Sequence, residues 1–336
     1  MAFLILVLFN LLRLADLTPC TEIILQTRNN FILGRTFDFS VNPHPRIVNF
    51  KKDIQLFDKK EKYAIDYPFA AISLFNHKNI ISEGINKKEL CVSILWMEDA
   101  SFAQKKDINN ENTLFVLDLP LLLLGKCETV REVIAFLKNK TIWSEHISIL
   151  NNDITEQIVP RIHLAVYDRF GEKIVIEFKK GKPRIFAHNG VITNQPSYPW
   201  HIEHLGLFTH LDNKTYHQPR TRHKSFYGGN GNGLFGLPGD YTSYSRFVRA
   251  SILKKIADEN IAKLPEAELI SYMDKLLSSL IVPQFVKLQQ SHDELRHTEN
   301  DLTYYQILKD QKNKKWYIKK YNEINYTEHN IKKLLT

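Results

Sequence analysis

The chain has 336 residues, 43% of them hydrophobic, and 45 Lys and Arg against 37 Asp and Glu give it a formal net charge of +8. This excess is modest, and the Lys-rich stretches at residues 51–62 and 312–320 alternate with apolar or aromatic residues, which is typical of solvated strand faces rather than of a phosphate-binding surface. We therefore expect no nucleic-acid partner, and the hydrophobic fraction is sufficient for a sizeable core.

The first residues predict a removable export signal. The run Ala2–Leu12 is apolar apart from Asn10, too short to span a bilayer as a helix but typical of a signal-peptide core. We expect residues 1–19 to be a signal peptide, with or without a short pro-segment at its end, and residues 20–336 to be exported to the periplasm or secreted. A lipoprotein signal that lipidates Cys20 is the alternative. No later run is long or apolar enough to give the mature chain a stable membrane span.

The first hundred residues predict antiparallel sheet after the leader. Short β-rich runs are separated by turn residues, with Gly84 and Asn86 between the last two runs. The runs are Glu22–Gln26, Phe31–Thr36, Phe69–Phe75 and Leu90–Trp96.

The chain then switches to helix. A polar stretch, Glu98–Asn112, leads into the apolar run Leu114–Leu124. Apolar residues next recur at helical spacing over Glu128–Leu137, and we expect Cys127 to open this helix.

A meander, two helices and a closing hairpin complete the predicted elements. The meander has strands His163–Asp168, Lys173–Phe178 and Arg184–Phe186; the helices are Ser245–Ala257 and Glu266–Leu280; the hairpin pairs Tyr304–Lys309 with Lys315–Tyr321. Runs of strands alternating with pairs of helices predict an α+β chain of packed layers. Neither an internal repeat nor a Ser/Gly/Pro-rich linker divides residues 20–336, so we expect one domain there.

Cys20 is the candidate nucleophile. Removal of everything before it would place a thiol and a free α-amine on one residue, which is a complete nucleophile and base pair. A thiol with an unperturbed pKa of about 8.5 gains from a nearby cation, which Arg35 would supply. The α-amine, with an unperturbed pKa of about 7.7 to 8.0, accepts a proton near neutral pH, and Asp38 would orient it. Arg35 and Asp38 are three residues apart, so both face Cys20 only if the strand bends; otherwise they form an ordinary surface ion pair.

Four motifs carry a resemblance to a known family. They are Cys20 itself, Gly34–Asp38, Thr193–Pro196 leading to Trp200 and His201, and Gly236–Asp240 leading to Ser245, Arg246 and Phe247. In this order, over nearly all of the chain after the leader, they resemble the choloylglycine hydrolase family of N-terminal-nucleophile hydrolases. That family holds penicillin V acylases and bile salt hydrolases, with relatives that cleave acyl-homoserine lactones. The resemblance implies a four-layer αββα fold, with two stacked antiparallel sheets flanked by helices, and a homotetramer.

The resemblance also assigns roles to single residues. It implies that Cys20 is the nucleophile, that Arg35 and Asp38 tune and hold it, and that Arg246 is a catalytic cation close to the thiol. Asn194 resembles the side-chain donor to the oxyanion, and a donor of this kind is worth about 3 kcal/mol of barrier lowering.

Trp96 falls where the family has its second oxyanion donor, a backbone N–H. Bile salt hydrolases tend to carry Asn at this position and several penicillin acylases Tyr, so Trp96 departs from the bile-salt pattern. It looks more like the exported enzymes that include penicillin V and homoserine-lactone acylases. Its indole would offer a flat apolar wall for an aryl or alkyl acyl chain, or would simply be part of the core.

Other residue patterns predict little chemistry. Cys91 and Cys127 are one conceivable bridge, but we expect unlinked core thiols. The 13 His form no cluster with metal-ligand spacing, so we expect no metal and no cofactor, and we expect His201 to be a structural hydrogen-bonder. The glycine-rich run at residues 228–233 predicts a mobile loop bordering the site.

The sequence thus predicts an enzyme that hydrolyses a small-molecule N-acyl amide. Penicillin V or a related compound is the first choice of substrate, a long-chain N-acyl-homoserine lactone the second and a conjugated bile salt the third. The rival is a secreted or lipid-anchored binding protein that keeps the fold with Cys20 blocked.

Overall fold

The computed structural model describes residues 20–28, 30–57, 62–105, 108, 112–151, 154–216, 230–286 and 301–336. The leader expected at residues 1–19 lies outside these ranges, as do the first two residues of the glycine-rich run.

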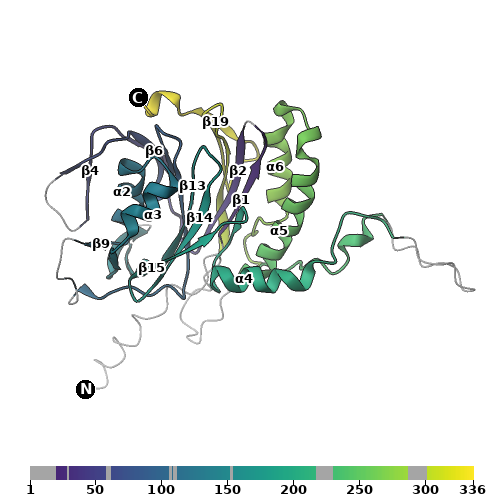
Figure 1. The fold of residues 1–336 in the computed structure, drawn as a ribbon, viewed down its shortest axis with the longest axis horizontal. Coiled ribbons are helices and arrows are strands. Elements are labelled where there is room, and N and C mark those ends of the chain that lie inside the picture. The colour runs from purple at the N-terminus through teal and green to yellow at the C-terminus, as the bar shows by residue number, and fades with distance from the viewer. Residues whose placement is uncertain are drawn as a thin grey trace, which may run out of the picture.

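Two antiparallel sheets form the centre of the molecule (Figure 1). The first has the strand order β16 (Val191–Ile192), β1 (Cys20–Gln26), β2 (Phe31–Phe39), β17 (Leu302–Asp310), β18 (Lys315–Lys320) and β19 (Thr327–Asn330). The second has the order β15 (Lys182–Ala187), β14 (Lys173–Lys179), β13 (Ile162–Tyr167), β8 (Cys91–Trp96), β7 (His77–Asn86), β6 (Phe69–Leu74) and β3 (Arg46–Phe50).

Smaller pairs lie outside these sheets: β4 (Asp53–Gln55) with β5 (Lys62–Ala64), β9 (Thr113–Phe115) with β10 (Thr141–Trp143), and β11 (Ile147–Asn151) with β12 (Ile154–Ile158). The α-helices are α2 (Asp118–Lys126), α3 (Val130–Leu137), α4 (Tyr198–Leu205), α5 (Ser243–Asn260) and α6 (Leu269–Ser278). Short 3₁₀ turns are η2 (Gly206–Phe208), η3 (Asn232–Leu234), η4 (Ile261–Lys263), η5 (Glu266–Glu268) and η6 (Lys332–Leu334).

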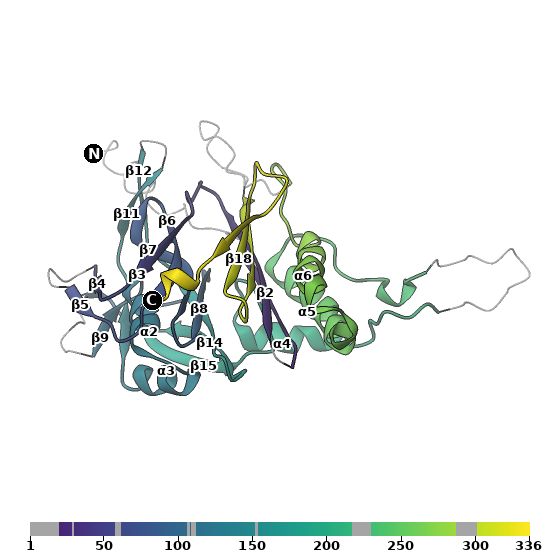
Figure 2. The same cartoon turned by 90° about the horizontal axis from the view of Figure 1, so that it is seen from above.

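The helices cover the outer faces of the two sheets. Helix α2 packs on β7 and β8, whereas α5 packs on β1 and α6 on β2 and β17. Viewed from above, α5 and α6 stand beyond one sheet, and α2 and α3 lie beside the other (Figure 2). The predicted α+β class and its four-layer αββα arrangement are therefore confirmed. No helix within the described ranges is both long and apolar enough to span a bilayer.

Helix α6 shows how sequence and packing agree. Leu269, Met273, Leu276 and Leu277 are its buried residues and recur at helical spacing. They lie over β2 at Gly34, where an added Cβ would stand only 2.6 Å from Cγ of Met273. A glycine is needed here because the helix approaches the strand closely.

Two local predictions are wrong. Gly84 and Asn86, which we expected between two strands, both lie within β7. A Cβ at Gly84 would stand 2.6 Å from Cδ1 of Leu124, so this glycine lets α2 approach the sheet. Cys127 does not open a helix but follows the last residue of α2, and Thr129 caps α3 through a bond from the backbone N–H of Glu132.

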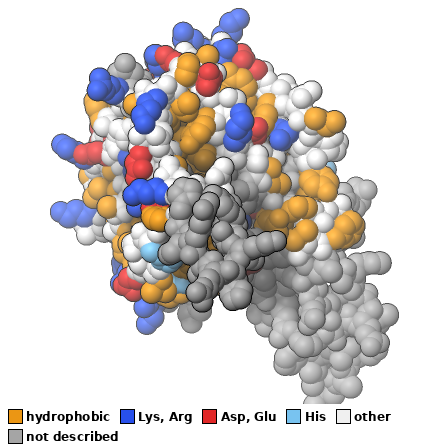
Figure 3. Space-filling view, turned by 90° about the vertical axis from the view of Figure 1, so that its right-hand side faces the viewer, with side chains coloured by type: hydrophobic (Ala, Val, Ile, Leu, Met, Phe, Trp, Pro, Cys, Tyr) orange, Lys and Arg blue, Asp and Glu red, His pale blue; other side chains and the backbone are white. Residues whose placement is uncertain are grey.

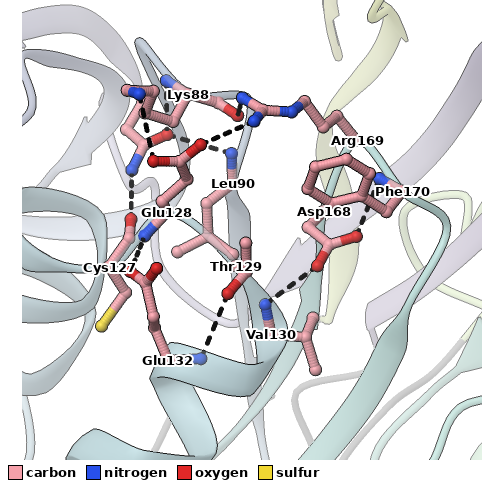
Figure 4. A network of polar contacts seen from close by, with 11 residues as sticks. Lys88, Leu90, Cys127, Glu128, Thr129, Val130, Glu132, Asp168, Arg169 and Phe170 are labelled. Carbon is pink, nitrogen blue, oxygen red and sulfur yellow. Dashed lines mark hydrogen bonds and ion pairs between the residues drawn. The ribbon is translucent and has the colours of Figure 1, made fainter.

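A polar network holds this helix junction against two strand turns (Figure 4). The carboxylate of Glu128 pairs with Lys88 at 3.0 Å and with Arg169 at 2.6 Å. Asp168, which is buried, accepts from the backbone N–H of Val130 at 3.0 Å and of Phe170 at 2.9 Å. The network joins the β7–β8 turn, the start of α3 and the β13–β14 turn.

The positive charge is spread over the surface that α5 and α6 present. Seen from that side, Lys and Arg side chains of the described residues stand singly among acidic and apolar ones (Figure 3). In the core, Cys91 and Cys127 are buried free thiols, as expected.

Within the seven-stranded sheet, the pairing between β7 and β8 ends before β8 does. Strands β7 and β8 pair only from Ile85 with Cys91 to Glu83 with Ser93. Beyond Ser93, the residues of β8 keep their partners on β13 but have none on β7. Beyond the last pair, Ser82 of β7 and Ile94 of β8 line one pocket together with Cys20, the first residue of β1.

Candidate active site

Cys20 lies at the start of β1, opposite Phe37 of β2, and is 2% exposed. Its Sγ atom lies 4.0 Å from Nη2 of Arg35 and 3.7 Å from the backbone carbonyl oxygen of Asp38. Burial raises the pKa of the thiol, and the positive charge of Arg35 opposes this shift. Arg35 is thus the cation that favours a thiolate at this position.

Arg35 lies beside the thiol on the neighbouring strand and reaches across the space between the sheets to the other sheet. Its Nη1 atom donates to the backbone carbonyl of Ser82 at 2.8 Å, and its Nη2 atom donates to the backbone carbonyl of Ile94. These carbonyls belong to β7 and β8 where the ladder between them has stopped. Burial alone would lower the pKa of Arg35, but the carboxylate of Glu83 offsets this and the pKa is raised.

Asn194 contacts both Cys20 and its surroundings. Its Oδ1 atom accepts from the backbone nitrogen of Cys20 at 2.7 Å, and its Nδ2 atom donates to the carbonyl of Trp96 at 2.8 Å. Its own carbonyl is bonded to Nε2 of His201 at 2.9 Å. Burial lowers the pKa of His201 to about 4, so this ring is neutral and holds Asn194 in place, as predicted for a structural histidine.

Arg246 approaches Cys20 from α5. Its Nη1 atom donates to the carbonyl of Cys20 at 2.7 Å and to the hydroxyl of Thr21, and its Nη2 atom donates to Oδ1 of Asn194 at 2.9 Å. Burial lowers the pKa of Arg246 to about 10, which still leaves it charged near neutral pH. The predicted cation is therefore next to Cys20, although its bonds are to the backbone of Cys20 and not to the thiol.

Asp38 lies beside Cys20 and contacts it through its backbone. Its backbone carbonyl lies at the thiol, and its carboxylate accepts from the hydroxyls of Thr36 at 3.2 Å and of Thr303. The nitrogen of Cys20 donates to Asn194, a contact that the sequence did not indicate. The predicted role of Asp38 toward the amine stays a prediction.

The backbone of Trp96 borders the same space. Because Met97 donates to the carbonyl of Arg161, and strand residues alternate in direction, the N–H and C=O of Trp96 point away from β13. They therefore point into the gap beside β7, where Nδ2 of Asn194 already contacts the carbonyl. The two groups expected to bind an oxyanion, Asn194 Nδ2 and the Trp96 N–H, are thus brought together.

A small apolar pocket opens beside the thiol. Residues of β7 and β8 line it where the two strands have separated, and Ser82 and Cys20 are its polar members. Its aromatic lining residues are Phe37, Phe39, Phe75 and Trp96, and its aliphatic ones include Leu74, Leu117, Ile147, Ile158 and Ile162. From the sequence we expected only Trp96 as a wall; the Phe37-Asp38-Phe39 pattern beside the Arg35 motif was a further signal.

The indole of Trp96 is fixed from its polar edge. Its Nε1 atom donates to the carboxylate of Glu98 at 3.0 Å, and Glu98 in turn pairs with Arg161. Across the described residues, no group of three His, Cys, Asp or Glu side chains could hold a metal ion. The arrangement therefore has the parts for nucleophilic attack on a carbonyl whose substituent is apolar.

The chain is similar to known proteins over most of its length. Residues 20–334 match the family of linear amide C–N hydrolases called the choloylglycine hydrolase family. A bile salt hydrolase/transferase of Clostridium perfringens is 28% identical over 249 residues, 72% of this chain and 73% of that protein.

Solved structures share the fold. A variant of the conjugated bile acid hydrolase from Clostridium perfringens superposes with a TM-score of 0.78 at 23% identity, covering 94% of this chain and 93% of that one. The penicillin V acylase from Agrobacterium tumefaciens has a TM-score of 0.68 at 18% identity, covering 94% and 87%. As its motifs predict, this chain belongs to the choloylglycine hydrolase family of linear amide C–N hydrolases.

Proposed function

We propose that the protein hydrolyses small-molecule N-acyl amides with Cys20 as the nucleophile. One observation carries this proposal: the thiol of Cys20 lies at an apolar pocket, and Asn194 contacts both the nitrogen of Cys20 and the backbone beside that pocket. An acyl chain in the pocket would place its amide carbonyl next to the thiol. Removal of residues 1–19 would turn the nitrogen of Cys20 from an amide into a free amine.

In the proposed first step, the amine accepts the thiol proton and the thiolate attacks the amide carbon. The negative oxygen is bound by the N–H of Trp96 and by Nδ2 of Asn194, which has one hydrogen on the carbonyl of Trp96 and a second to donate. Collapse of this intermediate breaks the C–N bond, and the leaving amine takes the proton from the α-ammonium. The acyl group remains on Sγ as a thioester.

The second step releases the acid. Water gives a proton to the α-amine and attacks the thioester carbon, and the same donors bind the oxyanion. Expulsion of Sγ, which recovers the proton from the α-ammonium, returns the thiol and frees the carboxylic acid. No cofactor is needed, because each proton lost in one step is regained in the other.

The pocket supports an aryl or alkyl acyl group, so penicillin V remains the first substrate proposed and a long-chain N-acyl-homoserine lactone the second. A conjugated bile salt is the alternative that the named Clostridium relative favours. Initial rates on these three amides, compared as kcat/KM, distinguish the choices. A preference for the bile salt of tenfold or more, on the order of a single pocket contact, would reverse our ranking.

We further propose that the mature chain begins at Cys20, is exported to the periplasm or secreted, forms one domain and assembles as a homotetramer. Intact mass and N-terminal sequence of the exported protein test the first point, and its mass in solution tests the last. An upstream start, or lipid on Cys20, would instead support the binding-protein alternative, because the thiol would lack its own amine as base.

Cys20→Ala provides the direct test of the nucleophile. We expect it to abolish hydrolysis, whereas Cys127→Ala, which removes a buried thiol near the end of α2, should retain it. Both variants are to be compared by thermal melting, so that loss of fold is not mistaken for loss of chemistry. Turnover by folded Cys20→Ala at the unmodified rate would disprove the mechanism.

A further inference from the structure

Four charged side chains are sealed between the two sheets behind the thiol. These are Glu22, Arg35, Glu83 and Lys309, of which Lys309 is the most exposed at 4%. They come from β1, β2, β7 and β17, so both sheets contribute, and in the strand register Glu22 stands opposite Arg35. We call them the inter-sheet charge cluster. Because buried charges persist only when they are paired, the balance of this cluster determines which of its acids is ionised.

Glu83 is shared by both cations of the cluster. Its Oε2 atom contacts Nζ of Lys309, and its Oε1 atom lies 3.7 Å from Nη1 of Arg35. The same Oε1 atom accepts from the hydroxyl of Tyr305 at 3.2 Å. Burial alone would raise the pKa of Glu83, but Lys309 and Arg35 lower it overall. Glu83 is therefore the ionised acid, with one negative charge between two positive ones.

Glu22 lacks comparable support. Within the part of the chain that the structure describes, neither oxygen of its carboxyl group makes a hydrogen bond of good geometry, and the hydroxyl of Ser93 opposes the effect of burial only in part. Burial raises the pKa of Glu22, and the opposing charges of Lys309 and Arg35 do not cancel this. Burial without strong donors favours the protonated form of a carboxyl, and we count Glu22 as neutral in the proposal below.

The cluster then has one positive charge in excess, because Arg35 and Lys309 face only one carboxylate. Arg35 is the member that touches the nucleophile, with Nη2 at 4.0 Å from Sγ of Cys20. We propose that Lys309 is a positioning residue for the hydrolysis: it takes up the charge of Glu83 across the sheet interface, which leaves the guanidinium of Arg35 free to balance a thiolate on Cys20. This inference rests on the proposed function of Cys20.

The tyrosines and the second cysteine of the facing strands stay neutral. Burial raises the pKa of Tyr167 and of Tyr305 well above the usual range and that of Cys91 to about 12. At the outer end of the hairpin, Lys314 is paired with Glu89 at 2.7 Å.

Two further charges near Cys20, those of Arg246 and of the Asp38 carboxylate, have opposite signs. Arg246 is a cation there, and the carboxylate of Asp38 raises its pKa against the larger effect of burial. The α-amine of the mature chain is the remaining base. The excess positive charge therefore depends on Lys309.

The substitution Lys309→Met tests the proposal, with Lys314→Met as the matched control from the same hairpin. The readout is the pH dependence of Cys20 alkylation by iodoacetamide, measured by peptide mass so that Cys91 and Cys127 are scored separately. For Lys309→Met, we expect the apparent pKa of Cys20 to rise by about one pH unit or more and alkylation below that pKa to slow by about tenfold. The acidic limb of kcat/KM should move with it, whereas Lys314→Met should leave both profiles in place.

A double variant separates charge from structure. Lys309→Met with Glu83→Gln removes one charge of each sign and restores the excess of one, so the apparent pKa of Cys20 should return toward that of the unmodified protein. A purely structural role predicts that the double variant is at least as impaired as the single one. The double variant also keeps the proposal testable if Lys309→Met alone fails to fold, because a raised thiol pKa in it would overturn the charge argument.

Two further variants complete the test. Lys309→Arg keeps the charge and should keep the pH profile, and Glu22→Gln should leave the profile unchanged if Glu22 is neutral as proposed. A shifted profile in Glu22→Gln would overturn the charge count, and an unshifted one in folded Lys309→Met would overturn the role of Lys309.

The alkylation assay requires no substrate, so the two hypotheses fail separately. If Cys20 is essential for hydrolysis but Lys309→Met does not change the pH profile of its alkylation, the inference is wrong and the proposed function stands. If Lys309 governs the thiol in a protein that cleaves none of the three amides, the proposed function is wrong and the inference stands.

Discussion

Asn194→Ala removes several contacts of the proposed active site at once. The substitution deletes the acceptor for the nitrogen of Cys20 and for Nη2 of Arg246, together with the Nδ2 donor proposed for the oxyanion. Loss of one oxyanion donor costs about 3 kcal/mol of transition-state stabilisation, which is about 10²-fold or more in kcat. The unpaired guanidinium nitrogen of buried Arg246 should also lower the free energy of unfolding by about 1–3 kcal/mol.

The loss in kcat is measured by steady-state hydrolysis of whichever amide the enzyme cleaves. The loss in free energy of unfolding is measured by urea unfolding of the same preparation. Asn194→Asp is the matched variant, because it keeps an oxygen for Cys20 and Arg246 while replacing the Nδ2 donor. We expect it to lose activity like Asn194→Ala but to lose less stability. A folded Asn194→Ala protein whose kcat stays within about tenfold of the unmodified value would refute the assignment of an oxyanion donor.

The remaining predictions concern the pocket, the packing and the pH dependence of stability. Trp96→Ala removes an aromatic wall and should lower kcat/KM for penicillin V by about tenfold or more at an unchanged rate of Cys20 alkylation; equal losses for all three amides would contradict this. Gly34→Ala places a Cβ 2.6 Å from Cγ of Met273 and should cost about 1–3 kcal/mol in urea unfolding, whereas Gly239→Ala, with nothing within 4 Å, should be near neutral. Burial raises the pKa of Glu177 to about 7. Its folded-state pKa thus exceeds the unfolded one, and ionising it costs stability as the pH rises from about 4.5 to 7. Glu177→Gln should therefore stabilise the fold by up to about 2 kcal/mol at about pH 8 and by little at about pH 4, and a gain independent of pH would show that the carboxyl is not the cause.

Much of the fold could be predicted because the strongest patterns are local. The closing hairpin and helices α5 and α6 lie within a few residues of their predicted positions, since apolar spacing and turn residues agree there. Strand β7 was missed because Gly84 and Asn86 are turn formers by type, and only the approach of α2 explains a glycine inside the strand. Tertiary packing of this kind leaves no trace in a single sequence.

The site was predictable only in part. Cys20, Arg35, Asn194 and Arg246 could be named from motifs, and the structure brings them together. The contact of Asn194 with the nitrogen of Cys20, and the pairing of Glu83 with Lys309, could not be foreseen. In a four-layer fold both faces of each sheet are buried, so the alternation of residues along a strand does not reveal which charged side chains face one another.

Because pairing between β7 and β8 ends early, the two sheets supply different parts of the proposed active site. Cys20 and Arg35 belong to the sheet whose strands stay paired, whereas much of the substrate pocket is formed by the edges that have come apart. We expect side-chain substitutions along those edges to change which acyl group the proposed site accepts, because the groups that these edges give to the chemistry, the carbonyls of Ser82 and Ile94 and the N–H of Trp96, belong to the backbone.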